Sequence, residues 1–535
     1  MALRDRRLAQ LAFFAALAVV HTWPLAAGLT SWSRLDNADT ALNAWILAWV
    51  AHQLPIDPRH LFDANIFYPE PRTLAFSEHM IVQGVIGLPL FALGWSAVTV
   101  YNVLVLVGFA LSGLAMAVVV ERWTGSRRAG LVAGLAYAFN AHTMVRFGHM
   151  QALHVQFLPL ALAAIHDLLD RPEWTAAARL ALWCALQALT SNYLLVMTAL
   201  AMVVSAAAAP AAWRGAGGRQ RAGQVVVAAA ACGLVLLPFL WPYYQANRTQ
   251  GLVRSFDEVA FYSGQWRDYL ATGGRLHYAA WSHRFFTHAT PLFPGITVLL
   301  LAGAALAAPA TWRAHRTRAM IALAVVAVVL SFGAAVPGYR WLYDHVALLQ
   351  GIRAVARFGW LWLLALAVLA GVGLARLERR WPDRAGLVAA AAAALVTVEA
   401  ARLPVGYTRF DGLPAIYRHV AALPPAVIAE FPFPDPAVIQ DNGPYVIAST
   451  THFQPMLNGY SGFTPASYFI HAAVARRFPS AESVREFGYL GVTHLVVHAA
   501  RLGDGVVAQL EATGAVRLVA REGDDRLYAL TAAAP

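Results

Sequence analysis

A polar loop at residues 31–79 separates the first two long apolar runs and contains side chains capable of acid–base chemistry. Asp36 and Asp39 lie three residues apart at its start, and Glu78 and His79 lie together at its end. A positioned carboxylate can act as a general base, and a carboxylate–histidine pair can ligate a divalent ion or contact a phosphate-linked group. These residues are therefore the first candidates for a catalytic or metal site.

A structural interpretation of the same acidic residues stays open. The segment ALNAWILAWVAHQL follows them directly, and its apolar and aromatic positions suit an amphipathic interfacial helix. Asn37 or Asp39 would then be an N-cap, because asparagine and aspartate are preferred there.

A second polar group lies in FNAHTMVRFGHMQALHVQFLPLAL, which we interpret as a tight turn near residues 142–152 between two spans. Arg146 and His149 lie closest to this turn. Ionisable residues at membrane depth are functional candidates by default, and an arginine among histidines suits an anionic substrate. The alternative is that these side chains anchor the segment at the membrane interface.

The third group is Arg353 and Arg357 in LLQGIRAVARFGWLWLL, directly before an apolar run. A spacing of four places both guanidiniums on one helix face, and paired arginines bind phosphate well. A structural role at the membrane interface is the alternative.

The elements that must position these residues are transmembrane helices. Of 535 residues, 59% are hydrophobic and 13% are charged, whereas soluble chains carry about a quarter charged residues. The net charge of +11 comes from arginines in short clusters between apolar runs, and the sequence has no lysine. Such clusters set membrane orientation, so we expect no nucleic-acid partner, and no P-loop or other nucleotide-binding motif is present.

The sequence predicts about eleven transmembrane helices. The apolar runs are 8–29, 97–120, 129–146, 150–168, 176–191, 193–210, 223–241, 291–310, 319–336, 358–375 and 385–401. The run within residues 80–95 is short for a span of about 20 residues, and if it crossed, the later arginine clusters would lie outside. We therefore interpret it as a re-entrant or interfacial helix, with the N-terminus in the cytoplasm and loop 31–79 outside.

After Ala401 prolines and charges return, together with short β-like runs at Val427–Phe431, Val492–His498, Ala515–Ala520 and Arg526–Leu530. The predicted fold is an all-α polytopic membrane bundle, residues 1–401, followed by a small extracytoplasmic α/β domain, residues 402–535.

The motifs LDNADTALNAW, RTLAFSEH and QGIRAVARF, with EFPFP, HFQPMLNGYSGFTPASY and LGVTHLVVH near the end, resemble the GT-C superfamily of membrane glycosyltransferases. This resemblance covers essentially the whole chain. It implies a polyprenyl-phosphate sugar donor, a catalytic base at Asp39 with Asp36 second, and phosphate binding by Arg353 and Arg357. Some members hold a divalent metal, for which the resemblance implies Glu78 and His79.

The sequence thus predicts an inverting glycosyltransferase of the bacterial plasma membrane that acts on its outer face. Its expected partners are a polyprenyl-phosphate-linked sugar, a lipid, glycan or protein acceptor, and membrane lipids. The two alternatives are a transporter or flippase of lipid-linked saccharides, and a non-catalytic GT-C-like assembly protein. The absence of an internal repeat counts against a transporter.

Overall fold

The computed structural model describes residues 2–286 and 290–531, which form two compact units. Unit 1 comprises Met1–Gly28, Val103–Pro238 and Val253–Gly406, and unit 2 comprises Leu29–Asn102, Phe239–Leu252 and Tyr407–Pro535. The first outer loop thus groups with the C-terminal segment, rather than with the membrane bundle that the sequence assigned it to. Hydrogen bonds explain this grouping, since residues of the loop pair with backbone groups near Met456 and Asn458.

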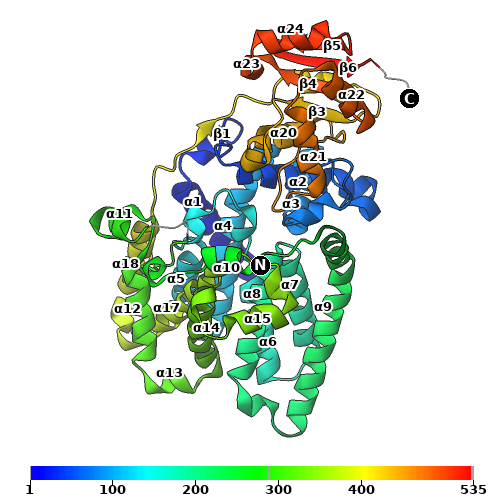
Figure 1. Cartoon of the computed structure of the whole chain (residues 1–535). Helices are drawn as coiled ribbons and strands as arrows, with labels where there is room; N and C mark the ends of the chain where they lie inside the picture. The colour runs from blue at the N-terminus through cyan, green and yellow to red at the C-terminus, as the bar shows by residue number, and fades with distance from the viewer. Residues whose placement is uncertain (1, 287–289, 532–535) are drawn as a thin grey trace. The chain divides into compact units, whose positions relative to one another are not determined.

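Unit 1 is made of helices (Figure 1). Its longer helices are α1 (Ala2–His21), most of α4 (Ala97–Thr124), α5 (Arg127–Ala138), α6 (Phe157–Asp170), α7 (Trp174–Ala188), α8 (Asn192–Ala207), most of α9 (Gly215–Gln250), α12 (Ile296–Leu306), α14 (His315–Ser331), α17 (Trp360–Arg380) and α18 (Ala385–Ala400). Residues 97–102 of α4 and 239–250 of α9 belong to unit 2. Its shorter helices are α10 (Phe256–Phe261), α11 (Arg275–Ala280), α13 (Pro309–Arg313), α15 (Tyr339–His345) and α16 (Ala347–Gln350).

Every apolar run predicted as a span overlaps one of these longer helices. By length and composition, 3 helical segments of the described chain can cross a membrane: Ala97–Thr124, Gly215–Gln250 and Val355–Arg380. The other helices are too short or too polar to meet this criterion. A helical membrane bundle is therefore supported, whereas the number of about eleven spans stays a prediction.

Helix α17 is the central helix of unit 1, with α5, α12, α14 and α18 packed against it. In its most apolar window, 89% of the residues are buried. At Gly373 an added Cβ would lie 1.8 Å from the carbonyl oxygen of Leu301 in α12, so a side chain there would force the two helices apart. Small residues allow such close approach between membrane helices. Neighbours on many sides therefore fix α17 and the residues at its start.

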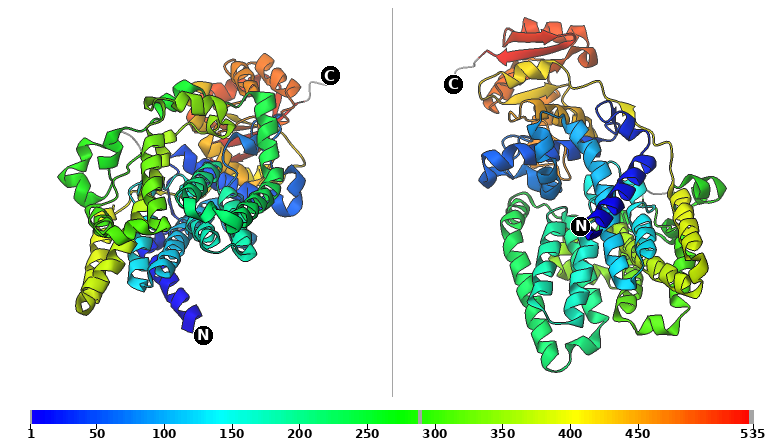
Figure 2. Two further views of the ribbon diagram at one scale, coloured as in Figure 1. Left: turned by 90° about the horizontal axis from the view of Figure 1, so that it is seen from below. Right: turned by 180° about the vertical axis from the view of Figure 1, so that it is seen from behind.

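Helices α6, α7 and α8 pack side by side (Figure 2). Leu168 of α6 and Leu180 of α7 belong to one buried apolar cluster, to which Ala228 of α9 contributes. The chain enters α6 from the loop after α5 and enters α8 at Asn192. These two entry points supply walls of the pocket described below.

Unit 2 combines helices of the first outer loop with the C-terminal segment. Its helices are α2 (Ala38–Ile56), α3 (Ile81–Ala92), α19 (Ile416–Ala421), α20 (Gly443–Ala448), α21 (Ala466–Ala475), α22 (Ala481–Tyr489), α23 (Ala499–Leu502) and α24 (Asp504–Ala512). Its strands are β1 (Trp32–Ser33), β2 (Thr408–Arg409), β3 (Ile428–Phe431), β4 (His494–His498), β5 (Val516–Glu522) and β6 (Asp525–Leu530). Strands β1 and β2 pair antiparallel, which ties the start of the loop to the start of the C-terminal segment.

The four predicted C-terminal strands form one sheet in the order β3-β4-β6-β5. Strands β3 and β4 are parallel, and β5 and β6 form the predicted hairpin across a turn at Gly523, whose φ is +60°. Figure 1 shows α23 and α24 beside this sheet. The small α/β fold of the C-terminal segment is thus confirmed, because alternating and continuous apolar runs report buried strands directly.

Helix α2 differs from its prediction as an amphipathic interfacial helix. All its residues from Thr40 to Ala51 are buried, and α3 and α20 pack against it within unit 2. The continuous burial explains its apolar and aromatic character. Helix α3 has 12 residues and rises about 18 Å, which is short of the roughly 30 Å hydrocarbon core. Its interfacial location stays a prediction.

A buried ionic network holds β3, β4 and β6 together. The Nε2 atom of His498 lies 3.0 Å from Oε2 of Glu430, and its Nδ1 atom lies 2.7 Å from Oδ1 of Asp525. The hydroxyl of Tyr417 donates to Glu430 over 2.8 Å. Although burial alone would lower it, the hydrogen bonds to Asp525 and Glu430 raise the pKa of His498 to about 9. An imidazolium between two carboxylates therefore joins three strands of the sheet.

We predict that alkaline pH weakens unit 2 through His498. Because the folded-state pKa lies above the ordinary value of about 6.5, the stabilisation is complete below that value and is lost as pH rises through about 9. The melting temperature of the full chain should fall by roughly 5 °C or more between pH 6.5 and 9.5. His498→Gln should lower the melting temperature at pH 6.5 and reduce this pH dependence. An unchanged pH dependence in His498→Gln would contradict the assignment.

Candidate anion-binding pocket and carboxylate site

The loop between α5 and α6 is longer than the tight turn that the sequence predicts. Helix α5 ends at Ala138, because the side-chain oxygen of Asn140 accepts hydrogen bonds from the backbone N–H groups of His142 and Thr143, each over 3.0 Å. Asparagine competes with the helix in this way by bonding its own backbone. The chain continues through two short 3₁₀ turns, Thr143–Val145 and Met150–Ala152, before α6 begins at Phe157.

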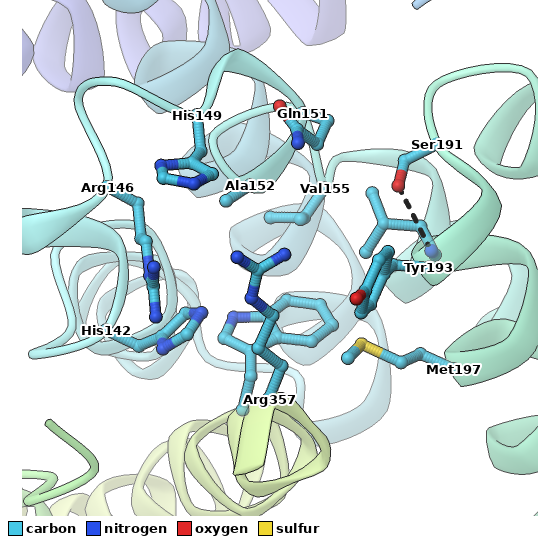
Figure 3. A pocket seen from close by; sticks show the side chains of 12 residues that line it. His142, Arg146, His149, Gln151, Ala152, Val155, Ser191, Tyr193, Met197 and Arg357 are labelled. Atoms are coloured by element: carbon cyan, nitrogen blue, oxygen red, sulfur yellow. Dashed lines mark hydrogen bonds between the residues drawn. The ribbon is translucent and has the colours of Figure 1, made fainter. Parts of the chain in front are cut away.

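This loop, the start of α8 and the start of α17 enclose a pocket with about 420 Å³ of space outside the atoms, including part of its open mouth. Its lining residues are His142, Arg146, His149, Gln151, Ala152, Val155, Ser191, Tyr193, Leu194, Met197, Arg357 and Trp360. Figure 3 shows the side chains of Arg357, Arg146, His142 and His149 around one shared space, with Tyr193 on the far side of Arg357. The sequence predictions for Arg146, His149 and Arg357 thus fall on one pocket.

Arg357 is positioned by Tyr193, a residue that no sequence motif singles out. The guanidinium carbon lies 4.9 Å from the centre of the Tyr193 ring, a distance at which cation and aromatic ring attract. The Tyr193 hydroxyl accepts a hydrogen bond from the backbone N–H of Ala354 over 3.3 Å. Tyr193 therefore contacts both the side chain of Arg357 and the backbone just before it. Tyr193 and Arg357 are far apart in sequence, so this role becomes visible only in the folded structure.

The charge of the pocket comes from its two arginines. Burial, followed by the neighbouring Arg146 and Arg357 guanidiniums, holds the pKa of His142 well below its usual range. Burial and the same two guanidiniums, with Arg353, also lower the pKa of His149. Both imidazoles are then neutral near pH 7 and can donate or accept hydrogen bonds. No carboxylate is among the lining residues in the described chain, so the pocket is suited to an anion.

Arg353 does not share a helix face with Arg357, and that prediction is wrong. Arg353 precedes the 3₁₀ helix Val355–Gly359, and Ala354, with φ −90° and ψ 72°, breaks helical geometry between them. The Arg353 guanidinium instead donates to Oε1 of Glu258 over 3.2 Å and lies 5.4 Å from the Tyr262 ring centre. A carboxylate thus compensates Arg353, and this side chain does not line the pocket.

His154, the last histidine of the polar segment, is a buried structural residue. Its Nε2 atom lies 3.0 Å from the carbonyl oxygen of Leu104 in α4. Its ring packs closely against Gly108 of the same helix, where an added Cβ would lie 2.9 Å from the ring. It therefore joins the loop to α4 and takes no part in the pocket lining.

In unit 2, Asp39 lies in the first turn of α2 and does not cap it. Asn37 is the N-cap, since its side chain accepts a hydrogen bond from the backbone N–H of Asp39 over 2.8 Å. The Asp39 carboxylate accepts a hydrogen bond from the hydroxyl of Tyr460 over 2.6 Å. A carboxylate near a helix N-terminus is also favoured by the helix dipole. The Asp39 side chain is half-buried. The hydrogen bond from Tyr460 fixes the orientation of its carboxylate, which is the acceptor.

The turn NGYSGFTP, residues 458–465, brings Tyr460 to Asp39. The backbone N–H of Phe67 donates to the carbonyl oxygen of Asn458 over 3.1 Å, and a Cβ at Gly459 would lie 2.6 Å from the Phe67 ring. Phe67 itself has a positive φ of 59°, which costs a non-glycine residue of order 1–3 kcal/mol. Close packing between loop and turn therefore fixes the hydroxyl that contacts Asp39.

The remaining residues of the first loop occupy different environments. Asp36 is exposed and forms a 3.0 Å ion pair with Arg34. Glu78 and His79 are both buried, the Nδ1 atom of His79 accepts from the backbone N–H of Ile81 over 3.4 Å, and burial lowers the pKa of His79 to about 4.

The proposed metal ligands do not form a recognisable metal site. Among the described residues, no group of three or more His, Cys, Asp or Glu side chains is placed to hold a metal ion. Glu78 and His79 supply two donors, and the His79 Nδ1 atom already accepts a hydrogen bond. A divalent metal at these residues stays a prediction, and we assign it no step in the chemistry.

Comparisons with protein-family models and with curated proteins gave no match. Among solved structures, the archaeal oligosaccharyltransferase AglB from Archaeoglobus fulgidus, in complex with an inhibitory peptide and a dolichol-phosphate, is 13% identical with a TM-score of 0.47 over 99% of this chain and 74% of its own. ArnT from Cupriavidus metallidurans bound to undecaprenyl phosphate is 15% identical with a TM-score of 0.38 over 92% of this chain and 97% of its own.

At such identities and TM-scores these structures carry no family, residue role or ligand to this chain. The resemblance of its motifs to the GT-C superfamily stays a prediction from the sequence. The candidate chemistry of the chain depends on the pocket and carboxylate described above.

We predict that Gly459→Ala destabilises unit 2. The added Cβ would overlap the buried Phe67 ring, and overpacking of this kind costs about 1–3 kcal/mol. Thermal unfolding of the purified full chain should show a lower melting temperature. Gly505→Ala is the matched control, because a Cβ there meets nothing within 4 Å and Gly505 lies in a helix. Equal melting temperatures for the two variants would contradict the packing argument.

Proposed function

We propose that this protein is a membrane glycosyltransferase that transfers a sugar from a polyprenyl-phosphate donor to an acceptor hydroxyl. The pocket around Arg146 and Arg357 binds the donor phosphate, and Asp39 is the general base. The reaction takes place on the outer face of the bacterial plasma membrane, with the N-terminus in the cytoplasm and unit 2 extracytoplasmic.

The observation that carries this proposal is the convergence of two arginine side chains on one pocket. Arg146 and Arg357 line one space with two neutral imidazoles, and no carboxylate is among the described lining residues. A guanidinium offers a planar array of donors that matches phosphate oxygens. Arg357 belongs to a helical segment apolar and long enough to span a membrane, which suits a phosphate attached to a long apolar chain.

The same arginines suit the transition state of sugar transfer. As the bond between the anomeric carbon and the phosphate oxygen breaks, its electron pair moves to that oxygen and negative charge grows there. Fixed donors aimed at developing charge lower the barrier. Neutral His149 and His142 can donate further hydrogen bonds to the leaving phosphate.

Asp39 supplies the complementary step at the acceptor. The acceptor oxygen attacks the anomeric carbon and its proton passes to the Asp39 carboxylate, so that one displacement forms the new glycosidic bond and inverts the anomeric centre. The Tyr460 hydroxyl, 2.6 Å from Asp39 Oδ1, fixes the orientation of the carboxylate. The products are the glycosylated acceptor and polyprenyl phosphate.

The proposal predicts that Arg357→Gln weakens binding of undecaprenyl phosphate to the purified full chain by about 10- to 100-fold, because hydrogen bonds to charged groups contribute about 1.5–3 kcal/mol. Arg353→Gln is the matched control, since Arg353 pairs with Glu258 outside the pocket lining, and should change the affinity less than about 3-fold. Native mass spectrometry with titrated lipid measures both. Equal losses in the two variants would rule out the assigned pocket.

Substitution of the base gives a second test. Asp39→Asn keeps the shape of the side chain and should reduce transfer by about 10²–10⁴-fold, whereas Asp36→Asn should retain it, because Asp36 is exposed and paired with Arg34. The assay mixes membranes containing each full-length variant with synthetic undecaprenyl-phosphate monosaccharides and quantifies liberated undecaprenyl phosphate. Wild-type rates in Asp39→Asn would overturn the assignment of the base. Lipid-linked sugar that crosses vesicles without release of undecaprenyl phosphate would instead establish the transporter alternative.

A further inference from the structure

A second pocket in unit 1 lies along the other half of α17. It has a cavity volume of about 350 Å³, and residues from the end of α4, from α13, α14 and α17 line it. Figure 1 shows α13, α14 and α17 gathered in the same part of unit 1. A volume of this size is within the range of small-molecule sites.

Two arginines give this pocket a polar end. The Arg316 guanidinium donates to Asp170 and lies 5.5 Å from the Trp123 ring centre, and its buried Nε atom has no hydrogen-bond partner in the described parts of the chain. Arg379 is exposed and has no hydrogen-bond or ion-pair partner among the residues the structure describes. Asp170 can neutralise only one of the two charges, and no carboxylate is among the described lining residues. The polar end therefore attracts an anion.

Thr124, Thr311 and Thr317 also line the pocket, and its wall along α17 is apolar. Val368, Leu369 and Val372 of α17 face it, with Met320 of α14. From Arg379 back to Val368 the helix rises about 16 Å, roughly half of a 30 Å hydrocarbon core. A soluble phosphate compound has no apolar group that could pack against this wall, whereas one acyl chain of a lipid would cover it.

Aromatic residues mark the polar end as the level of a membrane surface. Trp312 of α13 and Trp381, directly after α17, are each 49% exposed. Tryptophan gathers at membrane–water interfaces, where its ring is partly wetted. The two arginines thus lie at the depth at which lipid headgroups carry their phosphates.

This pocket is separate from the arginine–histidine pocket proposed for the donor. Trp360 lines the donor pocket and Arg379 lines the second one, and about 28 Å of helix lies between them. A span of that length connects opposite faces of a bilayer. The second pocket therefore faces the leaflet opposite to the proposed reaction.

We propose that the second pocket binds an anionic glycerophospholipid, with its phosphate between Arg316 and Arg379 and one acyl chain along α17. The lipid seals the gap between α4, α14 and α17 and fixes the lower half of the central helix. This role does not depend on the transfer reaction, because neither arginine lines the donor pocket.

The test is native mass spectrometry of the detergent-purified full chain titrated with phosphatidylglycerol, and with phosphatidylcholine of the same acyl chains. The wild type should prefer phosphatidylglycerol by about tenfold or more, and Arg379→Gln should remove most of this preference. Arg380→Gln is the matched control, because it removes the same charge from the neighbouring exposed residue outside the lining. Equal effects of the two substitutions, or no lipid preference in the wild type, would overturn the proposal.

A second variant separates a lipid from free phosphate. Val372→Phe keeps both arginines and fills the apolar part of the pocket, so it should weaken phosphatidylglycerol binding while the chain still elutes as a single species. If inorganic phosphate in large excess displaces the lipid and Val372→Phe binds lipid like the wild type, the pocket recognises only the headgroup, and the lipid assignment fails.

Discussion

The proposed chemistry depends on two guanidiniums that share one pocket, whose described lining residues include no carboxylate. Arg146 and Arg357 lie within a helical unit of low charge, and like charges in partly buried surroundings repel. The fold tolerates them because Tyr193 lies against one guanidinium and Thr290 accepts from the other over 3.2 Å. The remaining electrostatic cost is relieved when an anion binds. This relief of repulsion is the physical reason for proposing an anionic ligand in the pocket.

The helices around this pocket explain how such an arrangement is maintained. Helix α17 is surrounded by neighbours, and the close approach at Gly373 fixes it against α12. The α5–α6 loop is held by the Asn140 side chain at its start and by His154 at its end. Each functional side chain thus projects from a segment whose backbone is fixed elsewhere. Pre-organised donors of this kind need little rearrangement as charge develops.

Much of this architecture can be predicted from sequence, since long apolar runs and alternating strands report burial directly. The C-terminal strands and the helices that overlap the apolar runs follow from this signal. Arg146, His149 and Arg357 were selected as charged or ionisable side chains beside apolar runs, and they line one pocket. Contacts between side chains far apart in sequence cannot be predicted from such patterns. The contact of Arg353 with Glu258, the ring of Tyr193 beneath Arg357 and the bond from Tyr460 to Asp39 join residues far apart in sequence. The predicted shared helix face of Arg353 and Arg357 was wrong for a related reason. Residues four apart share a face only inside a helix, and the helix begins after Arg353.

The most direct test of the central claim is an experimental structure of the full chain in a lipid bilayer with undecaprenyl phosphate bound. Phosphate density is expected within hydrogen-bonding distance of Arg357 and Arg146, with His142 or His149 in contact and Arg353 still paired with Glu258. Phosphate density away from this pocket, with Arg146 and Arg357 unoccupied, would contradict it.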